Sequence, residues 1–341
     1  MNPAKPTDVR LSQPVLPTGR GELSDRVLRA LRGRPGREDW PPSSDGAVHE
    51  ADPYGEDLHL ALYLCYELHY RGFRGVDPAW EWDPALLRLR AGLERRFLDT
   101  LRMDTEDHPH GADEAFDAIL VEPVHGTGLS HFLQDEGQLW QLREYAAQRS
   151  LYHLKEADPH AWVIPRLRGR AKAAMVAVEF DEYGGGRADR MHSRLFADLM
   201  TDLGLNTTYG RYLDAAMAET LASVNLMSML GLHRALRGAL VGHFAAVEVT
   251  SSPASRRLAE AMRRADAGEA AVHFYTEHVE ADAVHEQVVR RDVVGGLLED
   301  EPWLETDVAF GVAATDLLDT RIGGRTLAVW RDGRTSLRTP L

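Results

Sequence analysis

Three side chains that can bind a metal recur at helical spacing in the last third of the chain. His278, Asp282 and His285 stand at positions i, i+4 and i+7 within the stretch FYTEHVEADAVHEQV. At roughly 100° per residue, these positions return to nearly the same face of a helix. Two imidazoles and a carboxylate suit first-row metals such as iron, manganese or zinc. Histidine pairs also arise by chance on charged helices, so a metal site requires further ligands from other helices.

Three residues upstream are candidates for those further ligands. Glu156 lies near the end of a predicted helix, and Glu182 lies at the end of the next one, just before three consecutive glycines. His192 follows Glu182 by ten residues. A tight glycine loop lets two helices pack closely and direct both side chains to one point. A single glutamate at a helix end is usually solvated, although it opposes the helix dipole there, so the prediction depends on the whole set.

The charge of the set comes within one unit of balancing two divalent metals. Its three carboxylates carry a charge of −3 against +4 for two ferrous ions, and three neutral imidazoles complete the shell. The predicted metal ligands are Glu156, Glu182, His192, His278, Asp282 and His285. No catalytic group beyond these ligands is predicted, and no phosphate-binding loop, dinucleotide fingerprint or Ser-His-Asp signature is evident.

These ligand residues and their surroundings resemble the haem-oxygenase-like diiron oxidases and oxygenases, the iron-containing redox enzymes, in their actinobacterial form. The resemblance covers roughly Gly128 to Leu318 and includes the surroundings LKEADPHAW, EYGGG and FYTEHVEADAVHE. It implies an up-and-down helical bundle with two labile Fe(II) ions and dioxygen as co-substrate. It also implies that one iron takes Glu156, His192 and His278, and that the other takes Asp282 and His285, with Glu182 shared or assigned to the second iron.

Oxidation of a small metabolite is the activity that this resemblance implies. N-oxygenation of an amine or an amino-acid-derived substrate is the first expectation. Oxidative C–C cleavage or desaturation of an amino or fatty acid by the same site is an alternative. A non-catalytic protein that stores metal or binds a ligand is another. Ligand identity also permits a manganese–iron pair, and an external electron donor is a possible partner.

Composition narrows the class of protein. The chain has 341 residues, 44% of them hydrophobic, with a net charge of −14. The acidic balance argues against binding to nucleic acid or an anionic membrane and favours a small-molecule substrate. The single cysteine, Cys65, fits a reducing cytoplasm. No apolar run approaches the 18 or so residues of a membrane span, and no secretory signal is evident. A homodimer is left open.

The hydrophobic patterning predicts an all-α fold with a short β-hairpin at its C-terminal end. We divide the chain into a flexible tail over 1–45, a helical extension over 46–122, the diiron bundle over 123–318 and the hairpin over 319–341. The hairpin prediction rests on the alternation in RTLAVWRDGRTSLR around Asp332-Gly333. Helices are predicted from Asp57 to about Tyr70, Pro84 to Met103, Gly128 to Glu156, Gly169 to Tyr183, Asp189 to Leu203, Tyr209 to Val249 (as one helix or as two with a kink near Gly231), Ser252 to Ala267, Phe274 to Glu299 and Leu304 to Leu318.

Several other polar residues could belong to a site. Glu122 and His125 have the Glu-x-x-His spacing of ferritin-like diiron helices, but a proline lies between them. Glu248 ends an apolar helix and could line the cavity or lie at the surface. Tyr152 and Tyr275 could border the metals, although a buried tyrosine with a hydrogen-bond partner is the ordinary explanation.

Overall fold

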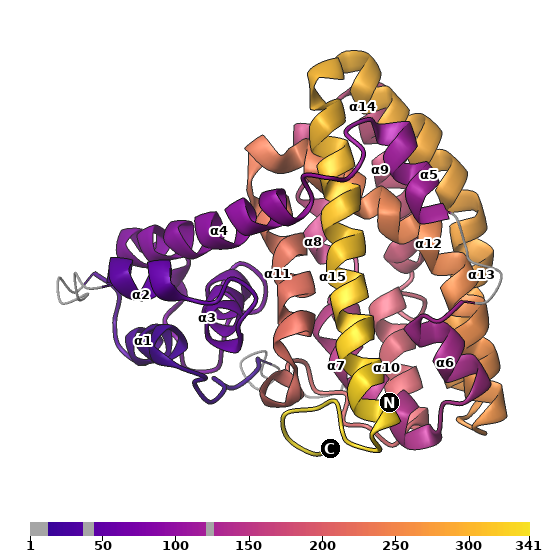
Figure 1. Ribbon diagram of the computed structural model, residues 1–341, viewed down its shortest axis with the longest axis horizontal. Helices are drawn as coiled ribbons and strands as arrows, with labels where there is room; N and C mark the ends of the chain where they lie inside the picture. The colour runs from indigo at the N-terminus through magenta and orange to yellow at the C-terminus, as the bar shows by residue number, and fades with distance from the viewer. Residues whose placement is uncertain (1–12, 37–43, 121–125) are drawn as a thin grey trace, which may run out of the picture.

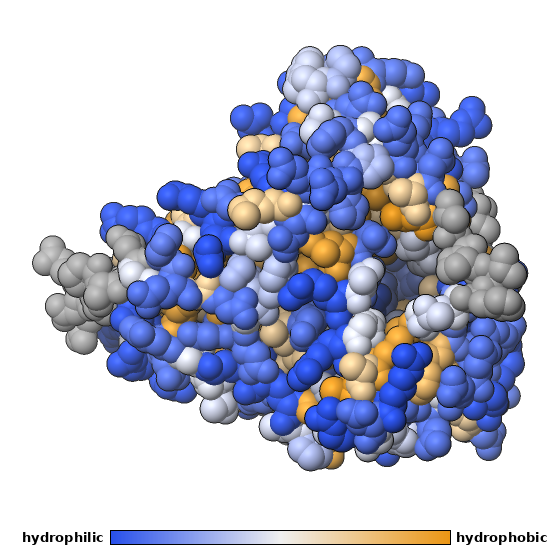
Figure 2. All heavy atoms as spheres, viewed as in Figure 1, coloured by the Kyte–Doolittle hydropathy of each residue, from blue (hydrophilic) through white to orange (hydrophobic). Residues whose placement is uncertain are grey.

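The computed structural model describes residues 13–36, 44–120 and 126–341, without the side chains of residues 44–45 and 280–284. Over this part of the chain the secondary structure is helical, and no strand is present. A bundle of long helices carries a smaller group of N-terminal helices on one side (Figure 1). Polar residues cover most of the face in Figure 2, with smaller apolar areas between them. None of the described helices is long and apolar enough to span a bilayer.

Three long helices form the centre of the bundle, and α12 contacts the other two most extensively. Their bounds are α12 (Arg237–Arg264), α13 (Glu269–Val288) and α15 (Glu305–Arg331). Glycines allow α12 and α15 to touch through their backbones. A Cβ atom at Gly242 would lie 2.0 Å from the carbonyl oxygen of Val308, and one at Gly311 would lie 2.0 Å from that of Ala239. Larger side chains would therefore force these two helices apart.

Four further helices surround this centre and bring the predicted ligands toward it. They are α7 (Leu139–His153), α9 (Gly169–Glu182), α10 (His192–Asp202) and α11 (Ala218–Leu232). The short helices α6 (Leu129–Asp135) and α8 (Asp158–Ala161) flank α7. Helix α13 passes through a π-helical turn at Val289–Val294 into α14 (Gly295–Asp300). Such turns often occur near functional sites.

The N-terminal helices pack on α11 and α15 through a conventional apolar core. They are α1 (Glu22–Leu31), α2 (Ser44–Glu50), α3 (Glu56–Glu67), α4 (Pro84–Asp104) and α5 (Ala112–Leu120). Helix α4 begins as the sequence predicts, since the Asp83 side chain accepts hydrogen bonds from the backbone N–H groups of Ala85 and Leu86 at 2.9 and 3.0 Å. Within the segment predicted to be a tail, α1 buries its leucines against α3. Residues 1–12 lie outside the described chain.

The predicted C-terminal β-hairpin is wrong. Helix α15 continues to Arg331, and Gly333 adopts a φ of 68° after it. The N–H of Gly333 bonds to the carbonyl of Trp330, and the N–H of Arg334 bonds to the carbonyl of Val329. This is a Schellman cap, in which a left-handed glycine satisfies the last carbonyls of a helix. Asp-Gly suits a hairpin turn and a helix cap equally, because both need a residue with positive φ.

Other helix boundaries also differ from the predictions. The helix predicted over Gly128 to Glu156 divides into α6 and α7 at Glu136–Gly137. The break predicted before Ser252 is absent, since α12 continues through Pro253. Helix α10 begins at His192 rather than at Asp189. Helix α5 forms between the helices predicted to end at Met103 and to begin at Gly128, where none was predicted, and it buries Ala112, Ala115 and Phe116.

Candidate metal centre

Glu156 lies in the turn between α7 and α8, where the backbone is sharply bent. The next residue, Ala157, has a φ of 74°, which a residue with a Cβ atom adopts only at an energetic cost. The turn directs Glu156 inward, and its side chain is buried. Its Oε1 lies 2.7 Å from Nδ1 of His153, one turn earlier on α7. Its Oε2 is buried without a hydrogen-bond partner.

Glu182 and His192 meet across the three glycines. Glu182 is the last residue of α9, His192 is the first of α10, and Glu182 Oε2 lies 2.7 Å from His192 Nδ1. Gly184 has a φ of 72°, and a Cβ atom there would lie 2.6 Å from the backbone nitrogen of Met191. Glycine is therefore required for this close turn. The glycine loop therefore brings the two side chains together.

Helix α13 contributes His278 and His285, both buried. Nδ1 of His278 lies 2.7 Å from the carbonyl oxygen of Phe274. Because that oxygen can only accept, Nδ1 carries the proton, and Nε2 is the nitrogen that can bind a metal. Nε2 lies 3.8 Å from Glu156 Oε1. The third residue of the column, Asp282, lies outside the residues whose side chains are described.

Glu248 joins the site from α12. It is buried, and its Oε2 lies 3.3 Å from Nδ1 of His285. The same nitrogen lies 3.8 Å from Glu182 Oε1. Sequence reasoning left Glu248 undecided between the cavity and the surface. The available signal was its position as an acid at the end of an apolar run, where burial without a positive partner is costly.

The ligand atoms form two neighbouring clusters of the size that one metal ion occupies. The atoms in each cluster lie within 4.8 Å of one another. The first cluster contains Glu156, His192 and His278, and the second contains Glu182, Glu248 and His285. The contact between Glu182 and His192 joins them. A cavity of about 90 Å³ reaches both clusters, since Glu156, Glu182, Glu248 and His278 all line it.

Electrostatics indicate a site that holds excess negative charge. Burial and the carboxylates of Glu182 and Glu248 raise the pKa of Glu179, on α9, to about 9. Burial also raises the pKa of Glu248. Burial alone would lower the pKa of His285, but its contacts with Glu248 and the nearby Glu182 raise it to about 9. In the metal-free protein, the negative charge of the site is thus reduced by protons bound to some of the carboxylates and to His285.

A pair of divalent cations fits these residues. Cations would replace the protons that now balance the carboxylates. The unpartnered Oε2 of buried Glu156 and both unpartnered oxygens of Glu179 are acceptors that a cation can satisfy. Mixed carboxylate and imidazole donors suit iron and manganese, and three protein ligands per ion leave positions open for small molecules. The role of each residue as a ligand stays a prediction.

Five of the six predicted ligands therefore lie together, and the first cluster is the set predicted for one iron. The second cluster contains Glu182 and His285, as predicted for the other iron, together with Glu248. Glu122 and His125 lie outside the described residues. Tyr152 and Tyr275 are buried and line the cavity beside the clusters. Burial raises the pKa of both phenols well above the usual value, so they stay protonated.

A buried ion pair connects the N-terminal helices to the turn that carries Glu156. Nζ of Lys155 lies 3.1 Å from Oε2 of Glu67, the last residue of α3, and the hydroxyl of Tyr209 donates to the same oxygen at 2.7 Å. Arg71 donates to the backbone carbonyl of Leu154 at 2.9 Å. These contacts hold the residues just before Glu156 from the side opposite the bundle.

Comparison with known proteins agrees with this site. The family model described as iron-containing redox enzyme matches residues 143–320, which include all six predicted ligands and Glu248. The chain therefore belongs to the iron-containing redox enzymes and is an oxidoreductase. It is 26% identical over 218 residues to the nitrosourea synthase of Streptomyces achromogenes subsp. streptozoticus. That match covers 62% of this chain and 46% of the relative, so the chain spans about half of the relative's length.

Proposed function

We propose that this oxidoreductase is a non-haem diiron oxygenase or oxidase that uses dioxygen to oxidise a small metabolite. The observation that supports it best is the pair of buried clusters, each with three ligand atoms within 4.8 Å, joined through Glu182 and His192. In the proposal, each cluster holds one ferrous ion, and Asp282 is a further ligand on the same helix as His278 and His285. Iron, when bound, supplies electrons to dioxygen and open coordination positions for it.

The protein residues around the clusters hold the ligands and limit access of water. The ring centroids of Phe274 and His278 are 4.4 Å apart, and those of Phe196 and His153 are 4.7 Å apart. These apolar contacts fix the two histidines and lower the local dielectric constant, which strengthens electrostatic interactions within the site. Tyr152 and Tyr275 keep their phenolic protons and are available as hydrogen-bond donors to a bound molecule.

We further propose that the substrate atom oxidised is an amine nitrogen. The support is the relative's printed name: a nitrosourea contains a nitroso group on nitrogen, so its synthesis needs oxidised nitrogen. The match covers under half of that relative. We therefore propose only the oxidation of nitrogen for this chain, and none of the relative's other activities. An external reductant would supply the electrons for repeated turnover.

Oxygen uptake tests the proposal. Protein loaded anaerobically with ferrous iron is mixed with dioxygen, a reductant and a panel of amines and amino acids. The expected result is iron-dependent oxygen consumption and a product heavier by one or more oxygen atoms, labelled when ¹⁸O₂ is used. The matched control is His278→Ala loaded in the same way, which should show neither. A product that has lost carbon or hydrogen without gaining oxygen contradicts N-oxygenation, and absence of iron-dependent uptake contradicts the oxygenase.

A further inference from the structure

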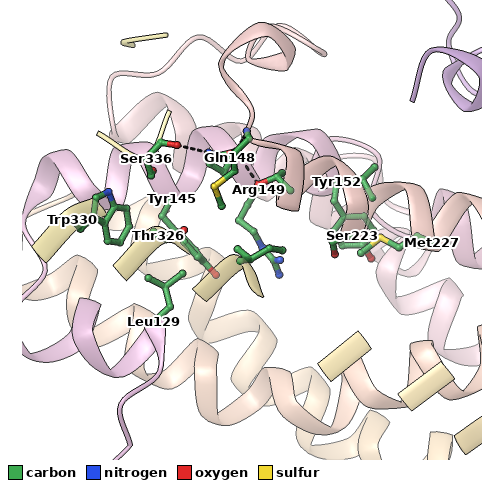
Figure 3. Close-up of a pocket in the computed structure, with 14 residues that line it drawn as sticks. Leu129, Tyr145, Gln148, Arg149, Tyr152, Ser223, Met227, Thr326, Trp330 and Ser336 are labelled. Carbon is green, nitrogen blue, oxygen red and sulfur yellow. Dashed lines mark hydrogen bonds between the residues drawn. The ribbon is translucent and has the colours of Figure 1, made fainter. Parts of the chain in front are cut away.

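The cavity beside the clusters is bordered by one face of α7. Tyr145, Arg149 and Tyr152 line it, and they also line a second cavity of about 30 Å³. The second cavity lies between α7, α11 and α15, with walls that include Met227, Thr326 and Trp330 (Figure 3). The three shared residues therefore form the boundary between the metal centre and a mainly apolar space on its far side.

Arg149 is the cationic group in this boundary. Figure 3, which draws the second cavity, shows its side chain extending from α7 in the same direction as that of Tyr145, and Arg149 also lines the cavity at the clusters. Its Nε is buried without a hydrogen-bond partner, and among the described residues no hydrogen bond or ion pair to its guanidinium is found. The aromatic contact it makes is distant, with Cζ 6.0 Å from the centroid of the Tyr145 ring. A buried N–H group without an acceptor is costly.

Two other arginines of the bundle, Arg264 and Arg237, have acceptors, whereas Nε of Arg143 on α7 is, like that of Arg149, buried without a hydrogen-bond partner. Arg264 donates to the backbone carbonyls of Leu133, Gln134 and Gly137. Arg237 pairs with Glu301, whose oxygen lies 2.7 Å from its Nε and Nη2. Burial is the largest electrostatic influence on Arg149, followed by the phenol of Tyr145 and then by Asp319 on α15, but no ion pair within 4.0 Å joins Arg149 and Asp319. The five donors of Arg149 therefore stay available to an acceptor that enters the cavity.

We infer that Arg149 binds a carboxylate group of the substrate, which makes the substrate an amino acid or another amine-bearing carboxylic acid. This inference rests on the proposed function for the orientation of the substrate, with its amine toward the clusters. A planar guanidinium binds a carboxylate through two parallel hydrogen bonds. One guanidinium balances one negative charge, and Glu156, Glu182 and Glu248, which line the same cavity, disfavour a more highly charged anion.

The geometry of α7 sets the scale of such a substrate. Arg149 stands one turn before His153, and His153 contacts Glu156. One turn of four residues advances about 6 Å along the helix axis. A carboxylate at Arg149 and an amine near the first cluster are therefore separated by a short chain of atoms.

Ligand binding to the metal-free protein tests this inference without using iron chemistry. The probes are 4-aminobutanoate, 6-aminohexanoate and L-lysine, each compared with its decarboxylated counterpart: propylamine, pentylamine and pentane-1,5-diamine. Isothermal titration calorimetry should show at least one acid binding about tenfold or more tightly than its counterpart. Arg149→Gln should remove that difference, because the neutral amide cannot replace a charge-assisted pair. Asp319→Asn should preserve or strengthen acid binding, since it removes a competing anion.

Arg143→Gln is the matched control, since Arg143 also lies on α7 but lines neither cavity. It should bind the acids as the wild type does. Circular dichroism and thermal unfolding establish that each variant is folded. The inference is overturned if no acid binds, if acids and counterparts bind equally, or if folded Arg149→Gln still prefers acids. The protein is metal-free throughout, so such a result does not test the diiron proposal. Iron uptake by the wild-type protein then shows whether the diiron proposal fails as well or only the inference about Arg149.

Discussion

The two clusters of the candidate metal centre use the same kinds of ligand but are supported differently. In the first cluster, buried contacts orient the ligands: His153 lies 2.7 Å from Glu156, and the Phe274 carbonyl accepts from His278. In the second cluster, His285 contacts Asp181 at 3.3 Å, and that carboxylate side chain is 61% exposed. Exposed charges are screened by water and salt. The first cluster is therefore the more rigidly organised of the two.

The clusters also differ in how much negative charge they hold. One carboxylate, Glu156, belongs to the first cluster, whereas the second has Glu182 and Glu248 with Glu179 close enough to be affected by both. Like charges in a buried site raise each other's pKa values. A cation at the second cluster would relieve this repulsion. Hydrogen bonds within the protein thus orient the ligands of the first cluster, whereas the arrangement of the second cluster depends more on the ion that it binds.

Removal of a ligand should have the largest effect. His278→Ala deletes a first-cluster ligand and Glu248→Ala deletes a second-cluster ligand, so each should lower the bound iron from two ions toward one per chain. Each should also reduce activity by more than about 100-fold, which exceeds the effect of losing an outer contact. Iron analysis after anaerobic loading and gel filtration measures the loss. His233→Ala is the control, because His233 caps the C-terminal end of α11 and contacts Glu94 rather than either cluster. It should keep full iron content, and equal loss there would contradict the assignment.

Loss of the buried ion pair between Lys155 and Glu67 should have the next largest effect. Lys155→Met leaves Glu67 as a buried carboxylate without its cation, which costs about 3–5 kcal/mol. Because Lys155 adjoins Glu156, the variant should lose iron from the first cluster before the second. Denaturant unfolding measures the stability. In Arg170→Met, the control, the lost ion pairs to Asp292 and Glu299 are exposed, so the change should stay below about 1 kcal/mol. Equal destabilisation of the two variants would refute the role given to burial.

The outer contacts allow the two clusters to be compared directly. His153→Phe removes the buried partner of Glu156 and should weaken iron binding at the first cluster by about 10- to 100-fold. Asp181→Asn removes the exposed partner of His285 and should change iron affinity at the second cluster by less than about threefold. Competition with a chelator measures both. A larger effect from Asp181→Asn would reverse the comparison.

The smallest expected effect is a dependence of stability on pH in the metal-free protein. The pKa of Glu179 is raised to about 9, above the value of an exposed glutamate, so the folded state binds the proton more tightly than the unfolded state. Its stabilising contribution is complete at acid pH and is lost as the pH rises toward 9. The slope should be at most about 1.4 kcal/mol per pH unit. Glu179→Gln should flatten this dependence of stability on pH. Bound metal should also flatten it, because nearby cations favour the ionised carboxylate of Glu179. An unchanged slope in Glu179→Gln would contradict this source.

The sequence predicted the parts of this site that local rules determine. The three glycines after Glu182 indicated a tight connection, and their positive φ values and the contact with His192 agree with it. The helical spacing of His278 and His285 likewise placed both in one buried region. Glu248 could not be assigned, because the rotation of an apolar helix determines whether an acid at its end faces inward. That rotation depends on packing, such as the glycine contacts between α12 and α15.

The same limit explains the errors in the fold. Asp332-Gly333 has the positive φ that both a hairpin and a helix cap require. Tertiary contacts decide between them, since Trp330 is buried and donates to Glu144 on α7. The spacing of buried Thr326, Leu327, Val329 and Trp330 follows a helix rather than a strand. Pro253 within α12 shows the same dominance of packing over local preference.

An anaerobic titration with ferrous iron, followed by removal of weakly bound metal, tests the central claim most directly. We predict two tightly bound irons per chain in the wild type and none in the double variant His278→Ala, His285→Ala, with circular dichroism showing that the variant stays helical. Wild-type protein that retains no iron, or a folded double variant that still retains two, would contradict a diiron centre at these clusters.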